Sequence, residues 1–101
     1  MSTPKPFEAR IELDGVVYLS GELDMDVADS FSQGLMSSLD GQQPVLDLSE
    51  LTFLDSSGIR AILQIARESR QAVVLRSVRP NVRRVLEATG MDETVGVRIE
   101  P

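Results

Sequence analysis

LTFLDSSG, residues 51–58, joins an apolar run to an aspartate, two serines and a glycine. Before it, residues 45–48 read Val-Leu-Asp-Leu, a pattern that predicts a buried strand. After it, apolar residues recur at helical spacing, which predicts a helix over residues 56–70. The hydroxyls of Ser56 and Ser57 are therefore expected where a helix begins, beside backbone N–H groups that lack helical partners.

Apolar patterning elsewhere predicts further strands and helices. Residues 7–13 and 16–20 alternate as two strands around Asp14-Gly15, which is expected to form a two-residue hairpin turn, and Gly21 is expected to break the second strand. A first helix is predicted from its apolar stripe at Val27, Phe31, Leu35 and Leu39, and it should end at Asp40-Gly41 and Pro44. A strand follows at 72–75. A further helix should begin at Pro80, bury Val82, Val85, Leu86 and Thr89, and end at Gly90, before a last strand at 95–99.

The predicted element order, β-β-α-β-α-β-α-β, is typical of the α/β class. Strands joined by helices are parallel neighbours, and the first hairpin adds an antiparallel strand. We therefore expect a mixed, mostly parallel sheet of about five strands. Residues 7–100 are expected to form one domain after a flexible tail over residues 1–6.

Size and composition narrow the function classes. The 101 residues, 42% of them hydrophobic, can form one small core. No apolar run approaches the roughly 20 residues that a membrane span needs, and the first residues lack a secretory pattern. We therefore expect a soluble cytoplasmic protein that does not enter a membrane. The chain contains neither Cys nor His, so disulfide, thiolate and imidazole chemistry are excluded.

The net charge of −6 is unevenly distributed along the chain. No Lys or Arg lies between Arg10 and Arg60, whereas ten acidic residues do. Residues 60–101 carry eight Arg against five acidic residues, a balance of +3. A nucleic-acid partner is not expected, because phosphate backbones demand a basic footprint. Segregated charge can steer a partner of opposite sign onto one face, or it can simply keep a small domain in solution.

Two loops carry the candidate site, because the carboxyl ends of parallel strands meet on one side of a sheet. One loop follows the second strand and contains Asp24, and the other covers residues 51–58. We therefore expect Asp24 and Asp55 to approach Ser56 on one surface. Gly58 is expected to allow a close backbone approach or a sharp turn there.

Catalysis is not expected at this site. A serine nucleophile needs a neighbouring base, but the chain has no His and its one Lys lies in the tail. Asp24 and Asp55 could in principle do acid–base work, although nothing in the sequence indicates a pocket for them. The spacing of a carboxylate metal cage and the motif of a phosphate-binding loop are both absent. No metal or cofactor is therefore expected.

Capping of the helix and modification by phosphate are two compatible roles for this motif. Asp55 or Ser56 is a good N-cap, which contributes about 1 kcal/mol to a helix. A phosphate on Ser56 would sit at a helix N-terminus, where the dipole and the free N–H groups favour anions. Phosphorylation is therefore expected to leave the fold intact.

The chain resembles the STAS domains of bacterial anti-sigma factor antagonists. The residues that carry the resemblance are GELD at 21–24, VLDLSELTFL at 45–54 and DSSG at 55–58. PNVRRVL, residues 80–86, is similar to the third helix of that family. Domains of this family usually continue past the last strand into a C-terminal helix, whereas this sequence ends at Pro101, so we expect the domain to lack that helix. An apolar strip left open there would support association, so we expect a monomer or a weak dimer.

The resemblance implies a partner-switching function. An unphosphorylated antagonist binds an anti-sigma factor that is also a serine kinase, and this frees a sigma factor. The kinase phosphorylates the first hydroxyl after the motif aspartate, here Ser56, and a serine phosphatase reverses the reaction. By the same resemblance, the partner-binding surface contains Asp24, Asp55, Ser56, Ser57 and Gly58.

Two other functions remain open from the sequence. One is a STAS binding subunit of a transporter or a sensory complex that is never phosphorylated, in which the hydroxyls of the motif are only caps. The other is a nucleotide-binding or weakly enzymatic domain that uses the groove beside Asp24. The lack of basic residues between positions 11 and 59 argues against phosphate binding there.

Overall fold

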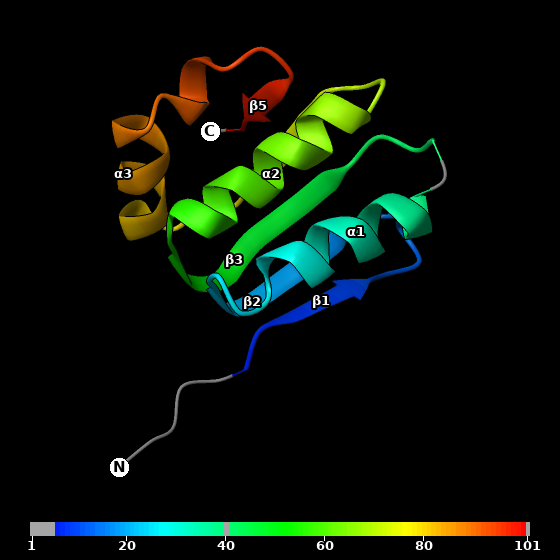
Figure 1. The fold of residues 1–101 in the computed structure, drawn as a ribbon, viewed down its shortest axis with the longest axis horizontal. Coiled ribbons are helices and arrows are strands. Elements are labelled where there is room, and N and C mark those ends of the chain that lie inside the picture. The colour runs from blue at the N-terminus through cyan, green and yellow to red at the C-terminus, as the bar shows by residue number, and fades with distance from the viewer. Residues whose placement is uncertain (1–5, 40, 101) are drawn as a thin grey trace.

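The computed structural model describes residues 6–39 and 41–100, and the elements follow the predicted order (Figure 1). They are β1 (Glu8–Ile11), β2 (Val17–Leu23), α1 (Ala28–Leu39), β3 (Val45–Leu54), α2 (Ser56–Glu68), β4 (Val73–Arg76), α3 (Pro80–Ala88), the short 3₁₀ helix η1 (Met91–Glu93) and β5 (Val97–Ile99). The five strands form one sheet in the order β1-β2-β3-β4-β5. β1 is antiparallel to β2 and the other pairs are parallel, so the predicted mixed α/β sheet is confirmed.

Two of the expectations fall largely outside the part of the chain that the structure describes. These are the flexible tail, of which only Pro6 is described, and the contribution of Asp40 to ending the first helix. Gly41 follows with a φ of +85°, consistent with a helix stop. No helix within residues 6–39 and 41–100 is both long and apolar enough to cross a membrane.

One face of the sheet is covered by α1 and α2, which lie side by side and pack against each other (Figure 1). The predicted stripe of α1 is buried at Phe31, Leu35 and Leu39, and Val27 precedes the helix. Helix α2 buries its apolar face on the same core. The residues of the strands that face these helices include Val17, Leu19, Leu23, Leu46, Leu48, Leu51, Leu54, Val73 and Leu75.

Strands β2 and β3 are both longer than the sequence predicted. Gly21 does not end β2. It has a φ of +85° and pairs with Leu51, the register then shifts by one extra residue of β3, and pairing continues to Leu23. The strand predicted over residues 45–48 continues to Leu54, and its later residues, expected to belong to the loop over 51–58, pair with the second half of β2. The loops before α1 and α2 are therefore short and are held directly by the ends of two paired strands.

The hairpin between β1 and β2 has a three-residue loop in place of the predicted two-residue turn. The N–H of Glu12 donates to the carbonyl of Val16 at 3.1 Å, which closes the loop. Within it, the N–H of Gly15 donates to the carbonyl of Glu12 at 2.9 Å, and Gly15 has a φ of +83°. A turn followed by a left-handed glycine is a common three-residue hairpin.

Helix α3 lies beside the part of β3 that extends beyond β4. The pairing of β4 with β3 ends at Asp47, so the later carbonyls of β3 have no strand neighbour on that side. The Arg79 Nε donates to the carbonyl of Ser49 at 2.8 Å, and the Asn81 Nδ2 donates to the carbonyl of Thr52 at 2.9 Å. These side chains provide hydrogen-bond donors for carbonyl groups at an edge of β3 that could otherwise pair with another strand.

The buried stripe of α3 is shorter than predicted. Val82 and Leu86 are buried and Val85 is half-buried, but Thr89 is exposed because it is the C-cap that follows the last helical residue. Gly90 has a φ of +77° directly after this cap, so its predicted role in ending the helix is confirmed.

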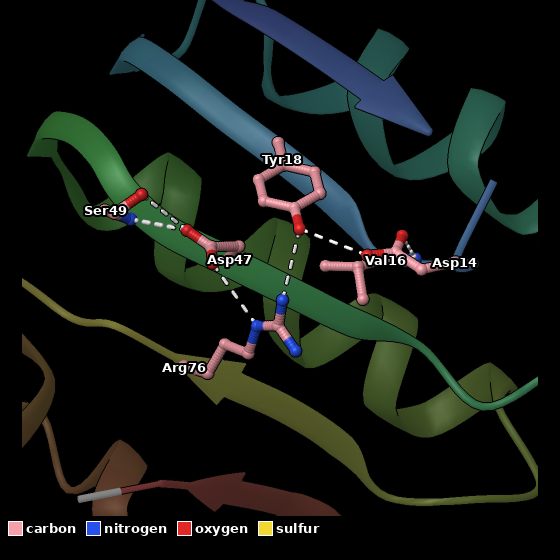
Figure 2. A network of polar contacts seen from close by, with 6 residues as sticks. All are labelled: Asp14, Val16, Tyr18, Asp47, Ser49 and Arg76. Atoms are coloured by element: carbon pink, nitrogen blue, oxygen red, sulfur yellow. Dashed lines mark hydrogen bonds and ion pairs between the residues drawn. The ribbon is translucent and has the colours of Figure 1, made fainter. Parts of the chain in front are cut away.

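The other face of the sheet carries a polar network around Asp47, which alternates along β3 with buried leucines (Figure 2). One carboxylate oxygen accepts from the Ser49 N–H at 2.9 Å and from the Ser49 hydroxyl at 2.6 Å. The other accepts from the Arg76 Nε at 3.2 Å. Arg76 also donates to the Tyr18 hydroxyl at 3.2 Å, and Tyr18 donates to Asp14 at 3.2 Å. The network therefore joins β2, β3 and β4.

The pKa of the Asp47 carboxyl lies below its ordinary value. Burial alone would raise this pKa, but the hydrogen bonds from Ser49 and the hydrogen bond and charge of Arg76 outweigh burial. A carboxyl whose pKa is lower in the folded than in the unfolded state contributes stability above the unfolded pKa. That contribution is lost as the pH falls through the folded pKa.

Replacing Asp47 with Asn is expected to lower the free energy of unfolding at neutral pH by about 2 kcal/mol, because bonds to a buried charged acceptor are lost. The deficit should shrink as the pH is lowered from about 7 to about 3, below the ordinary aspartate pKa. Urea unfolding at both pH values measures it. Asp92→Asn, at an exposed position, is the control and should change neither value. A deficit that stays constant across this range would contradict the explanation.

Candidate functional site

Helix α2 begins at Ser56, two residues after β3 ends at Leu54, and the intervening Asp55 is its N-cap. The Asp55 carboxylate accepts from the backbone N–H groups of Ser57 at 2.9 Å and Gly58 at 3.1 Å. Asp55 itself has the extended backbone that a cap requires. The sequence allowed either Asp55 or Ser56 as the cap. The structure assigns this role to Asp55, so the Ser56 side chain is not needed to begin the helix.

The second loop of the candidate site adjoins the first through the parallel pairing of β2 and β3 (Figure 1). Leu23 and Leu54, the last residues of these strands, are paired, and the Asp55 N–H donates to the Leu23 carbonyl at 3.4 Å. Asp24 therefore follows β2 at the same edge of the sheet where Asp55 follows β3. The prediction that topology brings these two loops together is confirmed.

Asp24 organises the approach to α1 much as Asp55 organises the start of α2. Its carboxylate accepts from the Asp26 N–H at 3.0 Å. Its carbonyl accepts from the N–H groups of Val27 at 3.2 Å and Ala28 at 3.0 Å. Both aspartates are half-buried, and both carboxylates accept hydrogen bonds from backbone N–H groups. Each one therefore fixes the geometry of its loop.

At Gly58, helix α2 approaches the end of β2 closely. A Cβ at this position would lie 2.7 Å from the Leu23 carbonyl oxygen and 2.8 Å from the Leu54 Cδ1. Gly58 is buried, and its φ is not among the positive values found at other glycines. Of the two roles that the sequence allowed, close approach is therefore the one that the structure uses.

The two hydroxyls of the motif have different surroundings. Ser56 is exposed at the first position of α2, whereas Ser57 is half-buried and lines a groove between α1 and α2. An exposed hydroxyl beside helical N–H groups can take a phosphate without being moved from a packed position. Of the two serines, Ser56 has the environment that suits modification.

The groove between α1 and α2 that Ser57 lines was not predicted from the sequence. Its volume is about 490 Å³, and its walls are formed by residues of α1 and α2 that lie more than twenty positions apart. Met25, in the loop before α1, lies at this groove and is 75% exposed. The only sequence signal was an apolar residue in an otherwise acidic loop, Asp24-Met25-Asp26. Within residues 6–39 and 41–100, no three acidic side chains gather closely enough to hold a metal ion.

Replacing Asp55 with Ala is expected to lower the free energy of unfolding by about 1 kcal/mol, because the N–H groups of Ser57 and Gly58 lose their acceptor. Asp55→Asn keeps a capping oxygen and should lose clearly less. Thermal and urea unfolding of both variants measure the difference. Equal losses in the two variants would show that the charge of Asp55, rather than its capping oxygen, provides the stability.

Comparison with known proteins agrees with this architecture. The STAS domain family model matches residues 7–101. A protein of Bordetella bronchiseptica, provisionally named anti-sigma factor antagonist BtrV, is 31% identical over 86 residues, which are 78% of this chain and 74% of that protein. The crystal structure of an anti-sigma factor antagonist from Mycobacterium paratuberculosis superposes with a TM-score of 0.77 at 31% identity, covering 97% of this chain and 90% of that one.

A more distant structure shares the fold. The anti-sigma factor antagonist SpoIIAA, solved in its unphosphorylated form, superposes with a TM-score of 0.62 at 19% identity, covering 95% of this chain and 89% of that one. At this identity the likeness concerns the fold alone. Together with the family model and the relatives at 31% identity, it leads to one assignment. The chain belongs to the STAS-domain family, among the anti-sigma factor antagonists.

Proposed function

We propose that this chain is a binding module, not an enzyme, and that it works as a phosphorylation-controlled partner switch. In its unphosphorylated form it binds an anti-sigma factor that is also a serine kinase, and the sigma factor is set free. Phosphorylation of Ser56 releases the partner, and a serine phosphatase restores the binding form. These partners act in the bacterial cytoplasm, where we expect the chain to reside. The observation that carries the proposal is the exposed Ser56 hydroxyl at the start of α2, next to the two aspartate-bearing loops.

The proposed docking surface consists of Asp24, Asp55, Ser56, Ser57 and Gly58. The backbones of its two loops are fixed by the cap of Asp55 and by the turn at Asp24. A surface that is ordered before binding loses little conformational freedom when the partner docks. Gly58 contributes through its close contact with Leu23, which holds the serines against the end of the sheet.

Electrostatics explain how phosphate would release the partner. A phosphoserine adds a charge of about −1.5 to −2. At position 56 it would lie beside Asp55 and on the half of the chain that has ten acidic residues and no basic ones between Arg10 and Arg60. Docking would then require a dianion to lose its water among like charges. The helix N-terminus favours an anion, so the isolated domain should keep its fold.

The proposal is tested by incubating the purified chain with ATP and its cognate anti-sigma kinase, followed by mass spectrometry. We expect one phosphate, located on Ser56 by fragmentation, in the natural chain and in Ser57→Ala. Ser56→Ala should take up none. A chain that binds the kinase without accepting phosphate would instead support the alternative of a STAS subunit that is never phosphorylated. Phosphate found only on Ser57 would contradict the assignment of Ser56.

A further inference from the structure

The groove between α1 and α2 begins beside the proposed docking surface and leads away from it. Ser57 and Met25 lie at it together with Asp29 of α1, and Arg60 and Glu68 of α2 are among its walls. The distance along α2 from Ser57 to Glu68 is about 16 Å at 1.5 Å per residue. The groove could therefore extend contact with a partner well beyond the immediate surroundings of Ser56.

Small side chains create this groove where the two helices come together. Ala28 and Ala61 are buried there, and longer polar side chains, such as Gln33 and Gln64, rise on either side. The furrow that these residues line has a volume of about 490 Å³. It is a depression with packed walls, which can accept protruding side chains of another protein.

The chemistry of the groove indicates what it accepts. Its walls carry two acids, Asp29 and Glu68, against one base, Arg60. Asp24 and Asp26 flank Met25 in the chain and add negative charge near that side chain. Met25 is 75% exposed, and methionine is enriched in protein interfaces because its flexible, polarizable side chain adapts to a facing apolar surface. An apolar contact inside a negative rim fits a basic protein segment, and it repels phosphate groups.

We propose that the groove binds a basic segment of the anti-sigma factor, with Lys or Arg side chains facing Asp29 and Glu68 and an apolar side chain resting on Met25. This inference rests on the proposed function, because the occupant is the same partner. It assigns a second part of the docking footprint, separate from Ser56. The serine then controls release, while the groove supplies affinity and selects partners by charge.

The test measures the dissociation constant of the purified cognate anti-sigma factor for charge variants of this chain. Glu68→Lys is the main variant, because Glu68 lies in the last turn of α2, where a cation is favourable and the fold should be retained. Glu87→Lys is the matched control, since Glu87 lies in the last turn of α3 and outside the groove. We expect Glu68→Lys to bind about tenfold more weakly and Glu87→Lys to bind normally.

Further variants test the apolar contact and the shape of the groove. Met25→Ala should weaken binding several-fold, and Gln64→Trp should weaken it by filling the groove. Affinity of the natural chain should also fall as salt is raised, and this dependence should be smaller in Glu68→Lys. Circular dichroism of each variant verifies the fold. Normal affinity in Glu68→Lys and Gln64→Trp, with their folds intact, would overturn the proposal.

The two proposals fail in different ways. If Ser56→Glu releases the partner while the groove variants bind normally, only the groove assignment is wrong. If the groove variants bind weakly while Ser56→Glu binds normally, the groove is correct and the phosphate switch is wrong. If the groove instead binds a labelled nucleotide and the purified anti-sigma factor does not bind at all, both proposals are overturned.

Discussion

Ser56→Glu is expected to weaken binding of the anti-sigma factor about a hundredfold or more, while Ser56→Ala binds as tightly as the unmodified chain. A hundredfold loss corresponds to about 2.8 kcal/mol. Burying an unpaired charge in an interface that already contains Asp55 is expected to cost at least that much. The exposed position of Ser56 means that neither variant disturbs the core. Isothermal titration calorimetry with the purified partner measures both dissociation constants.

Ser30→Glu is the matched control for this experiment. Ser30 is also an exposed serine in the first turn of a helix, but it lines the cavity between α1 and β1, away from α2. We expect Ser30→Glu to bind normally, and all three variants to keep the circular dichroism spectrum of the natural chain. A similar loss of affinity in Ser30→Glu would mean that total charge, rather than charge at residue 56, weakens docking. Unfolding of Ser56→Glu would contradict release without a change of fold.

Gly58→Ala is expected to cause the largest loss of stability among the substitutions considered, about 2–3 kcal/mol. The added methyl group would meet the Leu23 carbonyl oxygen at 2.7 Å and the Leu54 side chain at 2.8 Å. Neither can move freely, because Leu23 and Leu54 are paired strand ends that are buried in the core. The first turn of α2 would have to shift. For a domain of this size, thermal unfolding should shift downward by about 10 °C or more.

Gly34→Ala provides the opposite expectation and serves as the control. Gly34 lies within α1, and a Cβ there would meet nothing within 4 Å. Alanine has the higher helix propensity, so Gly34→Ala should stabilise the chain by about 0.5–1 kcal/mol. Thermal unfolding of the two variants side by side measures both effects. Equal stability of Gly58→Ala and the natural chain would contradict the close approach found at the start of α2.

The order and type of the elements could be predicted because the apolar residues of each buried face recur at the spacing typical of a helix or a strand. Helix α1 was visible in its four-residue spacing, and β4 in its continuous apolar run. The length of β3 was not visible, because two register shifts place extra residues in this strand and interrupt its two-residue alternation. The length of β2 was not visible because a glycine, Gly21, occupies one of its inward-facing positions, although burial alternates along the whole strand. Glycine is often a strand breaker, but Gly21 is paired with Leu51 inside β2, and the extra residue at the adjacent register shift is Thr52 of β3. Thr52 lies where the register slips, and its hydroxyl donates to the Gly21 carbonyl at 3.1 Å.

The centre of the candidate site was predictable because short-range signals define it. Asp55 before a helical pattern indicates a cap, and the topology of parallel strands brings Asp24 beside it. The groove could not be predicted, because it depends on how two helices distant in sequence pack. Asp47 was placed in the buried strand predicted at residues 45–48, but it was given no role of its own. Its alternation with core leucines and its pairing with Arg76 on the neighbouring strand become meaningful once the strand register is known.

We propose that negative charge on residue 56 excludes the partner while the fold stays the same. The most direct measurement phosphorylates the natural chain with its cognate kinase, separates the modified form, and compares the dissociation constants of both forms for the same purified anti-sigma factor. We predict a loss of about a hundredfold or more on phosphorylation, with full recovery after treatment with a serine phosphatase. Equal dissociation constants for the two forms would contradict the account.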